Sequence, residues 1–166
     1  MVTKINAYIF SVLLSLFSNL AIAETYVIPL TELDFSDFLP IPGSCEMDLD
    51  GLVTDLPGSQ MCIGSDNGKI AHYRIIATPG INVNIQVNTR LPSDGDGLTF
   101  TPVGKLTSDV DDINIVPGQV HIVNSGTLGR IDIKFGGQII LSSNYFSANM
   151  SHQIEMEAGI IWEDTP

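Results

Sequence analysis

The sequence predicts an all-β protein, an antiparallel β-sandwich of the immunoglobulin-like or pilin-like type. Apolar and polar residues alternate in several short segments, and this alternation places the apolar residues on one face of a strand. Gly, Pro, Asn and Asp separate these segments, and no apolar stripe with helical spacing is sustained. With 166 residues, of which 44% are hydrophobic, the chain has the size and composition of one domain.

The first 23 residues are predicted to be a signal peptide rather than part of this domain. Lys4 supplies a positive start, an apolar run follows from Ala7 to Phe17, and Ala21-Ile22-Ala23 has the form of a cleavage site. A transmembrane anchor is the alternative, but polar residues interrupt the run. We therefore expect residues 24–166 to form a single exported β-sandwich domain, in the periplasm, at the cell surface or outside the cell, with no membrane insertion after cleavage.

The chain is strongly acidic, with 7 Lys and Arg against 19 Asp and Glu and a net charge of -12. Removal of the predicted signal peptide takes away Lys4 and no acidic residue, so the exported chain is one unit more negative. Proteins that bind nucleic acid or anionic membranes need a basic surface, and the net charge argues against both classes.

The segment after the predicted cleavage site alternates at Tyr26, Ile28 and Leu30. These residues predict either the first strand of the chain's own sandwich or a donor strand that completes a neighbouring subunit. Pro29 restricts the segment to an edge or donor position, because proline cannot donate to a strand ladder.

Residues 38–66 are rich in Pro and Gly and are predicted to be mostly loop, with one short strand near Glu46–Asp50. This segment contains Cys45 and Cys62, and export permits them to form a disulfide. A two-cysteine metal site is the alternative, but it lacks the C-x-x-C spacing and a nearby histidine. We predict the disulfide and expect it to stabilise the fold by about 3 kcal/mol.

Two hairpins are predicted in the middle and late parts of the chain. Residues 81–88 alternate strictly and residues 71–77 do so except at Ile76, and Thr78-Pro79-Gly80 between them is typical of a turn. Residues 120–123 and 131–141 form the second predicted pair. A further alternating run, residues 150–160, predicts a strand near the C-terminus.

No catalytic site is predicted, and we expect no enzymatic activity. His72 and His121 fall on the polar faces of predicted strands, His152 lies near a strand start, and no pair has the spacing of metal ligands. The sequence also lacks a nucleophile elbow, and both cysteines are expected to be oxidised.

Residues 91–118 are again loop-rich, with short strands predicted at Leu98–Thr101 and Asp112–Val116. Calcium prefers oxygen ligands, so the clustered carboxylates of this region suggest a weak calcium site, formed by Asp94, Asp96, Asp109, Asp111 and Asp112. Lys105 occupies the position of the closing glutamate, however, and acidic turn residues usually bond only to their own backbone. Apart from this weak calcium site, no cofactor is expected.

Three segments then suggest a family: Leu33-Asp34-Phe35, the stretch GKIAHYRIIATPG at residues 68–80, and the stretch TLGRIDIKFGGQIIL at residues 127–141. In this order the chain resembles the bacterial domain of unknown function 4402 family, although Ser36 stands where that family usually has glycine. The resemblance implies an exported, fimbrial-like structural or adhesion protein of the cell surface, without catalytic residues. Its implied partners are other pilin-like subunits or a periplasmic chaperone, bound by strand addition. The alternative function is a secreted module that binds carbohydrate or calcium through the loops at 91–118.

Overall fold

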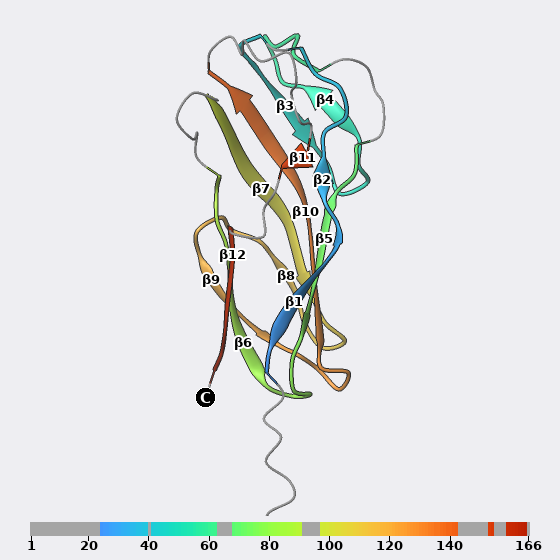
Figure 1. Ribbon diagram of the computed structural model, residues 1–166, viewed down its shortest axis with the longest axis vertical. Helices are drawn as coiled ribbons and strands as arrows, with labels where there is room; N and C mark the ends of the chain where they lie inside the picture. Colours follow the sequence, from blue (N-terminus) through green and yellow to red (C-terminus); the bar gives the residue numbers. More distant parts are fainter. Residues whose placement is uncertain are drawn as a thin grey trace, which may run out of the picture.

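The computed structural model describes residues 24–39, 41–62, 68–90, 97–142, 153–154 and 159–165. The predicted signal peptide and most of the predicted strand at 150–160 lie outside these residues. The secondary structure is almost entirely β, and every pair of strands is antiparallel (Figure 1). The predicted all-β, antiparallel fold class is therefore confirmed.

The larger sheet has seven strands and is built around one long central strand, β10 (Arg130–Leu141). One side of β10 pairs first with β5 and then with β3, and the other side pairs with β7 over almost its whole length. The remaining strands extend the sheet outward from these three. The six strands around β10 are β1 (Tyr26–Thr31), β3 (Gly43–Met47), β4 (Val53–Asp55), β5 (Ala71–Ile76), β7 (Leu98–Thr107) and β8 (Asp112–Asn114).

The smaller sheet has three strands, with β6 (Asn82–Val87) between β9 (Val120–Asn124) and β12 (Ile160–Asp164). A separate short pair joins β2 (Leu33–Asp34) to β11 (Gln153–Ile154). The two main sheets form the layers of a sandwich, because the alternating residues of both contribute to one buried cluster.

Aromatic rings fill the centre of the seven-stranded side of the core. The rings of Tyr73 and Phe135 stack at 6.0 Å between centroids, and Phe100 lies 6.2 Å from Phe135. Phe35 meets Phe100 edge to face at 6.0 Å. All four side chains are almost completely buried, so these contacts tie β5, β7 and β10 to the chain that follows β2.

Both predicted hairpins are wrong, although all four of their strands exist. β5 pairs with β1 and β10, whereas β6 pairs with β9 and β12, so the turn at 78–80 carries the chain from one sheet to the other. β9 and β10 are separated between the two sheets in the same way. Alternation shows which face of a strand is buried. The same alternation is expected whether two successive strands form a hairpin or lie in opposite sheets around one core, so it cannot distinguish the two arrangements.

The loop-rich regions contain more strand than predicted. The strand expected near Glu46–Asp50 starts earlier, at Gly43, and it pairs with β4, which was not predicted. The short strand expected at Leu98–Thr101 extends to Thr107 as β7. Proline and glycine lie inside β7 at Pro102 and Gly104, and Gly104 packs so closely against β10 that an added Cβ would lie 2.1 Å from the carbonyl oxygen of Lys134. A close strand contact therefore explains a residue that otherwise indicates a loop.

Candidate functional site

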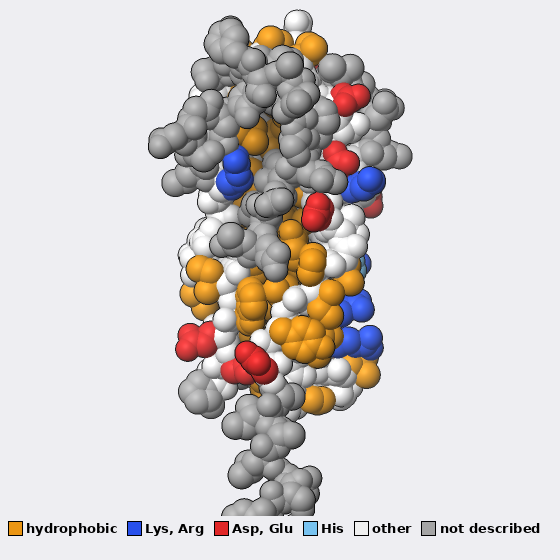
Figure 2. All heavy atoms as spheres, in the orientation of Figure 1, with side chains coloured by type: hydrophobic (Ala, Val, Ile, Leu, Met, Phe, Trp, Pro, Cys, Tyr) orange, Lys and Arg blue, Asp and Glu red, His pale blue; other side chains and the backbone are white. Residues whose placement is uncertain are grey.

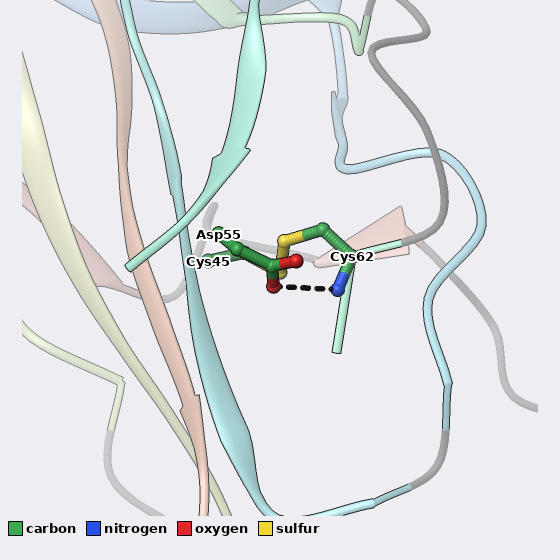
Figure 3. Close-up of side chains that lie close together, drawn as sticks. All are labelled: Cys45, Asp55 and Cys62. Carbon is green, nitrogen blue, oxygen red and sulfur yellow. Dashed lines mark hydrogen bonds between the residues drawn. A yellow bond between two sulfur atoms is a disulfide. The ribbon is translucent and has the colours of Figure 1, made fainter. Parts of the chain in front are cut away.

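The disulfide predicted between Cys45 and Cys62 is confirmed, with the two Cα atoms 6.1 Å apart. Cys45 lies on β3 and is fully buried, so the bond joins the sheet to the loop that follows β4. Asp55, at the end of β4, accepts a hydrogen bond from the backbone N–H of Cys62 at 2.9 Å (Figure 3). The same carboxylate oxygen accepts a bond from the Ser59 hydroxyl at 3.1 Å, and these contacts hold the loop against the sheet edge.

Cys45, Cys62 and Asp55 also place three atoms of metal-ligand type within 4.8 Å of one another. They are the one such group among the residues that the structure describes. Zinc is bound by thiolate sulfur, and here each sulfur is bonded to the other. The geometry therefore supports a structural cross-link at this position rather than a metal centre.

The predicted calcium ligands that the structure describes are bound to separate partners. Asp109 accepts hydrogen bonds from both the backbone N–H and the hydroxyl of Thr127, and these bonds lower its carboxyl pKa, against a smaller opposing effect of burial. Asp111 accepts the backbone N–H of Asn124 at 2.7 Å. Asp112 pairs with Lys105 at 3.0 Å. Asp94 and Asp96 lie outside the described residues.

The segment containing Tyr26, Ile28 and Leu30 is β1, an edge strand paired with β5 of the same chain. Val27 packs against the core, whereas Tyr26 and Leu30 are 50% and 45% exposed. The segment is thus the first strand of its own sheet. The alternation suggested that Tyr26, Ile28 and Leu30 face inward, whereas in the structure Val27 packs on the core. Pro29 lies on an edge strand, as its missing N–H requires.

Of the histidines, His72 lies on the outer face of its sheet, as predicted for a polar-face position, and His152 lies outside the described residues. His121 is different, because the face of β9 that is buried is the opposite of the predicted one. His121 is 8% exposed, and its Nε2 accepts the backbone N–H of Val116 at 3.1 Å. Val120 and Ile122 consequently point outward and are 51% and 59% exposed.

Basic side chains gather on the outer face of the seven-stranded sheet. Lys134 of β10 lies directly between His72 of β5 and Lys105 of β7, and Arg74 and Arg130 lie on the same face in the rows below. We call this surface the basic face; it consists of His72, Arg74, Lys105, Arg130 and Lys134. Figure 2 shows most of the visible Lys and Arg side chains along the right-hand margin, where β5 and β10 lie in Figure 1. Lys4 aside, the chain has six Lys and Arg residues, and four of them belong to this face.

Asp132 is the acidic residue within the basic face. Its Oδ1 lies 2.7 Å from Nε2 of His72 and 2.9 Å from both Nε and Nη2 of Arg74. Partial burial raises the carboxyl pKa, but the hydrogen bonds from His72 and Arg74 outweigh this effect and hold the pKa below its ordinary value. Asp132 therefore neutralises the row below Lys134. The side chain of Lys134 makes no hydrogen bond or ion pair with any residue that the structure describes.

A groove of about 320 Å³ opens beside the basic face. Its walls combine basic, acidic, hydroxyl and apolar side chains with two glycines, and consist of Thr31, Leu49, Asp50, Gly51, Gly68, Lys69, Ile70, His72 and Lys134. Lys69 lies 3.8 Å from Asp34, and its side chain is 67% exposed. Sequence reasoning missed this site because its residues come from four separate parts of the chain and form no local motif.

A second surface feature is the outer edge of β9. The backbone N–H of Asn124 donates to Asp111, away from β6, although Asn124 is opposite Asn82 of that strand. Backbone groups of an antiparallel strand alternate between its two sides, so those of Ile122 and Val120 also point away from β6. No strand in the described part of the chain pairs with this edge. Two exposed apolar side chains therefore lie along an edge whose backbone groups pair with no strand of the described residues; β9 itself is at the left of Figure 1.

Among the described residues, no helix has the length and apolar character needed to cross a membrane. Comparison of the chain with family models, with curated proteins and with solved structures finds no match.

Proposed function

We propose that the chain is an exported structural or adhesion protein of the bacterial surface, without catalytic activity, that assembles by strand addition. The observation that carries the proposal is the outer edge of β9, with which no strand of the described residues pairs. Such an edge offers a row of backbone donors and acceptors that an added strand can pair with, and natural proteins usually protect it with charges or bulges. The predicted signal peptide and the resemblance to an exported bacterial family support the location.

The strand that adds to β9 is a second copy of β9 itself. If two copies meet antiparallel about a two-fold axis at His121, the outward backbone groups of Val120 pair with those of Ile122 in the other copy. The same register places the two exposed apolar side chains opposite each other, which stabilises a strand pair. β9 contains no Asp, Glu, Lys or Arg, so two strongly acidic chains meet at an uncharged strand.

Sedimentation velocity of residues 24–166, with the disulfide formed, tests the assembly. We expect concentration-dependent association of the unmodified protein and a monomer for the variant Ile122→Lys, because a lysine pair cannot be buried at the strand contact. Leu128→Lys is the matched control: Leu128 is also 59% exposed but lies in the turn before β10. A monomer at all concentrations up to about 1 mM, or equal association of the two variants, would overturn the proposal.

Export is tested separately by expressing the full chain in a bacterium with a periplasm and determining the N-terminus of the product. We expect the processed chain to begin at Glu24 and to be recovered outside the cytoplasm. An unprocessed chain that is retained in the cytoplasm would contradict the proposed location.

The alternative, a binding module that uses the loops at 91–118, gains no support from the described part of those loops. The carboxylates of Asp109, Asp111 and Asp112 are each bound to a protein group and do not converge on a common centre. Their geometry is that of groups that fix turns and a strand end.

A further inference from the structure

We propose that the groove beside the basic face binds an acidic sugar, a sugar unit that carries a carboxylate or a sulfate. This binding activity is separate from assembly, because the groove lies on the seven-stranded sheet and β9 belongs to the other layer. The proposal rests on the placement of charge and on the chemistry of the groove walls.

The placement of charge breaks a rule of sheet stability. Lys134 is directly opposite Lys105 of β7, and like charges in directly opposite positions destabilise a strand pair. The chain has 19 acidic residues, yet none lies beside Lys134 in this row of β5, β10 and β7. Local rules are most often broken at functional sites, where a ligand supplies the missing partner. Here the missing partner is an anion.

The groove walls favour a sugar over a simple inorganic anion. Lys69 and Lys134 can pair with a carboxylate or sulfate, but Asp50 in the same groove would repel a bare anion and would instead accept hydrogen bonds from hydroxyl groups. Leu49 and Ile70 add apolar surface against which the carbon face of a sugar ring can pack. The volume, about 320 Å³, is at the small end of ligand sites and suits one or two sugar rings.

The acidic residues around the groove restrict the ligand to a short acidic sugar, because a longer anion would reach the acidic surface. The acidic residues Asp34, Asp50 and Asp112 border the basic side chains. At physiological salt, charges interact over about 8 Å, so the favourable contacts for an acidic group are confined to the immediate surroundings of Lys69 and Lys134, with the carboxylates of Asp34 and Asp50 close by. A nucleic-acid duplex or a membrane would extend beyond the groove onto acidic surface, which agrees with the exclusion of both from the net charge.

The experiment titrates residues 24–166 with defined oligosaccharides and follows the backbone amide signals by NMR. The carboxylated probe is a trimer of galacturonic acid, the sulfated probe is a sulfated disaccharide, and the controls are neutral maltotriose and sodium sulfate. We expect saturable shifts at Lys69, His72 and Lys134 with one or both acidic probes. Which of the two binds more tightly identifies the charged group that the site prefers.

Two variants connect the binding to the proposed residues. Lys134→Gln is expected to raise the dissociation constant about threefold, the effect of losing one exposed ion pair, and Lys69→Gln combined with Lys134→Gln about tenfold. Gln60→Glu changes the net charge as much as Lys134→Gln, at an exposed loop position, and is expected to leave binding unchanged. A melting temperature no lower than that of the unmodified chain shows that each variant is folded.

Three results would overturn the proposal. They are equal binding of maltotriose, equal binding of sodium sulfate alone, and no shift with either acidic probe at about 10 mM, where even a weak site would be occupied. The variant Ile122→Lys separates this proposal from assembly, since it should bind the acidic probes as the unmodified chain does. Loss of binding in that variant would mean that the groove depends on the assembled form and would contradict a separate site.

Discussion

Lys134 of β10 and Lys105 of β7 are directly opposite each other in the register of the seven-stranded sheet, on its outer face. Lys105 has a partner of its own, because its Nζ lies 3.0 Å from the carboxylate of Asp112. Lys134 has no such partner among the residues that the structure describes. The fold thus carries an unfavourable pair at a position where a neutral side chain would serve the sheet better.

Replacing Lys134 by a neutral β-branched residue should therefore stabilise the protein. We expect Lys134→Thr to raise the free energy of unfolding by about 0.5 kcal/mol, because it removes the like-charge pair and fits a strand better than lysine. Gln138→Thr, on the same strand and face, tests the strand preference alone and should gain less. Urea denaturation of the two variants gives the comparison, and a destabilised Lys134→Thr would show that the opposing charges cost the sheet nothing.

Asp132 should make the stability of the protein depend on pH at the acidic end. Its hydrogen bonds to His72 and Arg74 hold the carboxyl pKa below the ordinary value in the folded state. A carboxyl group with a lowered folded pKa contributes stability that is complete above its unfolded pKa, about 3.9, and is lost as pH falls through the folded pKa.

The variant Asp132→Asn tests this dependence. At pH 7 we expect it to be less stable by about 1 kcal/mol, since the loss of hydrogen bonds to charged groups is reduced by partial exposure. The difference between variant and unmodified chain should shrink as pH falls below about 4. Denaturant midpoints measured from about pH 4.5 to about 2.5 provide the test, and a difference that grows toward acid in this range would show that the sign is wrong.

The strand faces could largely be predicted from the sequence, whereas the strand neighbours could not. Ile81 to Asn88 and Ala71 to Ala77 alternate because one face of each packs on the core, as their alternation predicts. Neither segment carries a signal for its partners, since the same buried face serves in either sheet. For β9 the predicted face is wrong, because both faces of the strand carry apolar residues and the polar residue His121 lies on the buried face.

The disulfide was predictable because its two cysteines are the only ones in the chain and the predicted signal peptide points to a compartment that permits their oxidation. The basic face was not predictable, for a topological reason. His72, Lys105 and Lys134 are far apart in the sequence, and they become neighbours because β10 pairs with β5 on one side and with β7 on the other. The net charge of the chain indicated only the acidic average and concealed this local excess of positive charge.

Loss of the disulfide should destabilise the fold without changing its sheets. Cys45 and Cys62 are 17 residues apart, and opening a loop of this size costs about 3 kcal/mol in the chain-entropy model. We expect this loss in the double variant Cys45→Ala and Cys62→Ala, measured by denaturation. Asp55→Ala, which keeps the bond but removes the acceptor of the Cys62 N–H, should lose about 1 kcal/mol. Equal stability of the double variant and the unmodified chain would mean that the bond does not hold the loop.

The role of β1 can be decided by comparing two adjacent residues, because the two possible roles place opposite faces of the strand inward. Val27 packs against the core of its own chain, and Tyr26 is 50% exposed. We expect Val27→Asp to lower the free energy of unfolding by about 2 kcal/mol, the cost of placing a charge at a half-buried position, and Tyr26→Asp to have a much smaller effect.

A donor strand that inserts into a neighbour through Tyr26, Ile28 and Leu30 would give the reverse result. Tyr26→Asp would then abolish association, and Val27→Asp would leave the stability of the monomer unchanged. Thermal unfolding and sedimentation velocity of both variants distinguish these outcomes. Because β1 already covers β5 within the same chain, we expect stability to change through Val27 and association to be unaffected by either substitution.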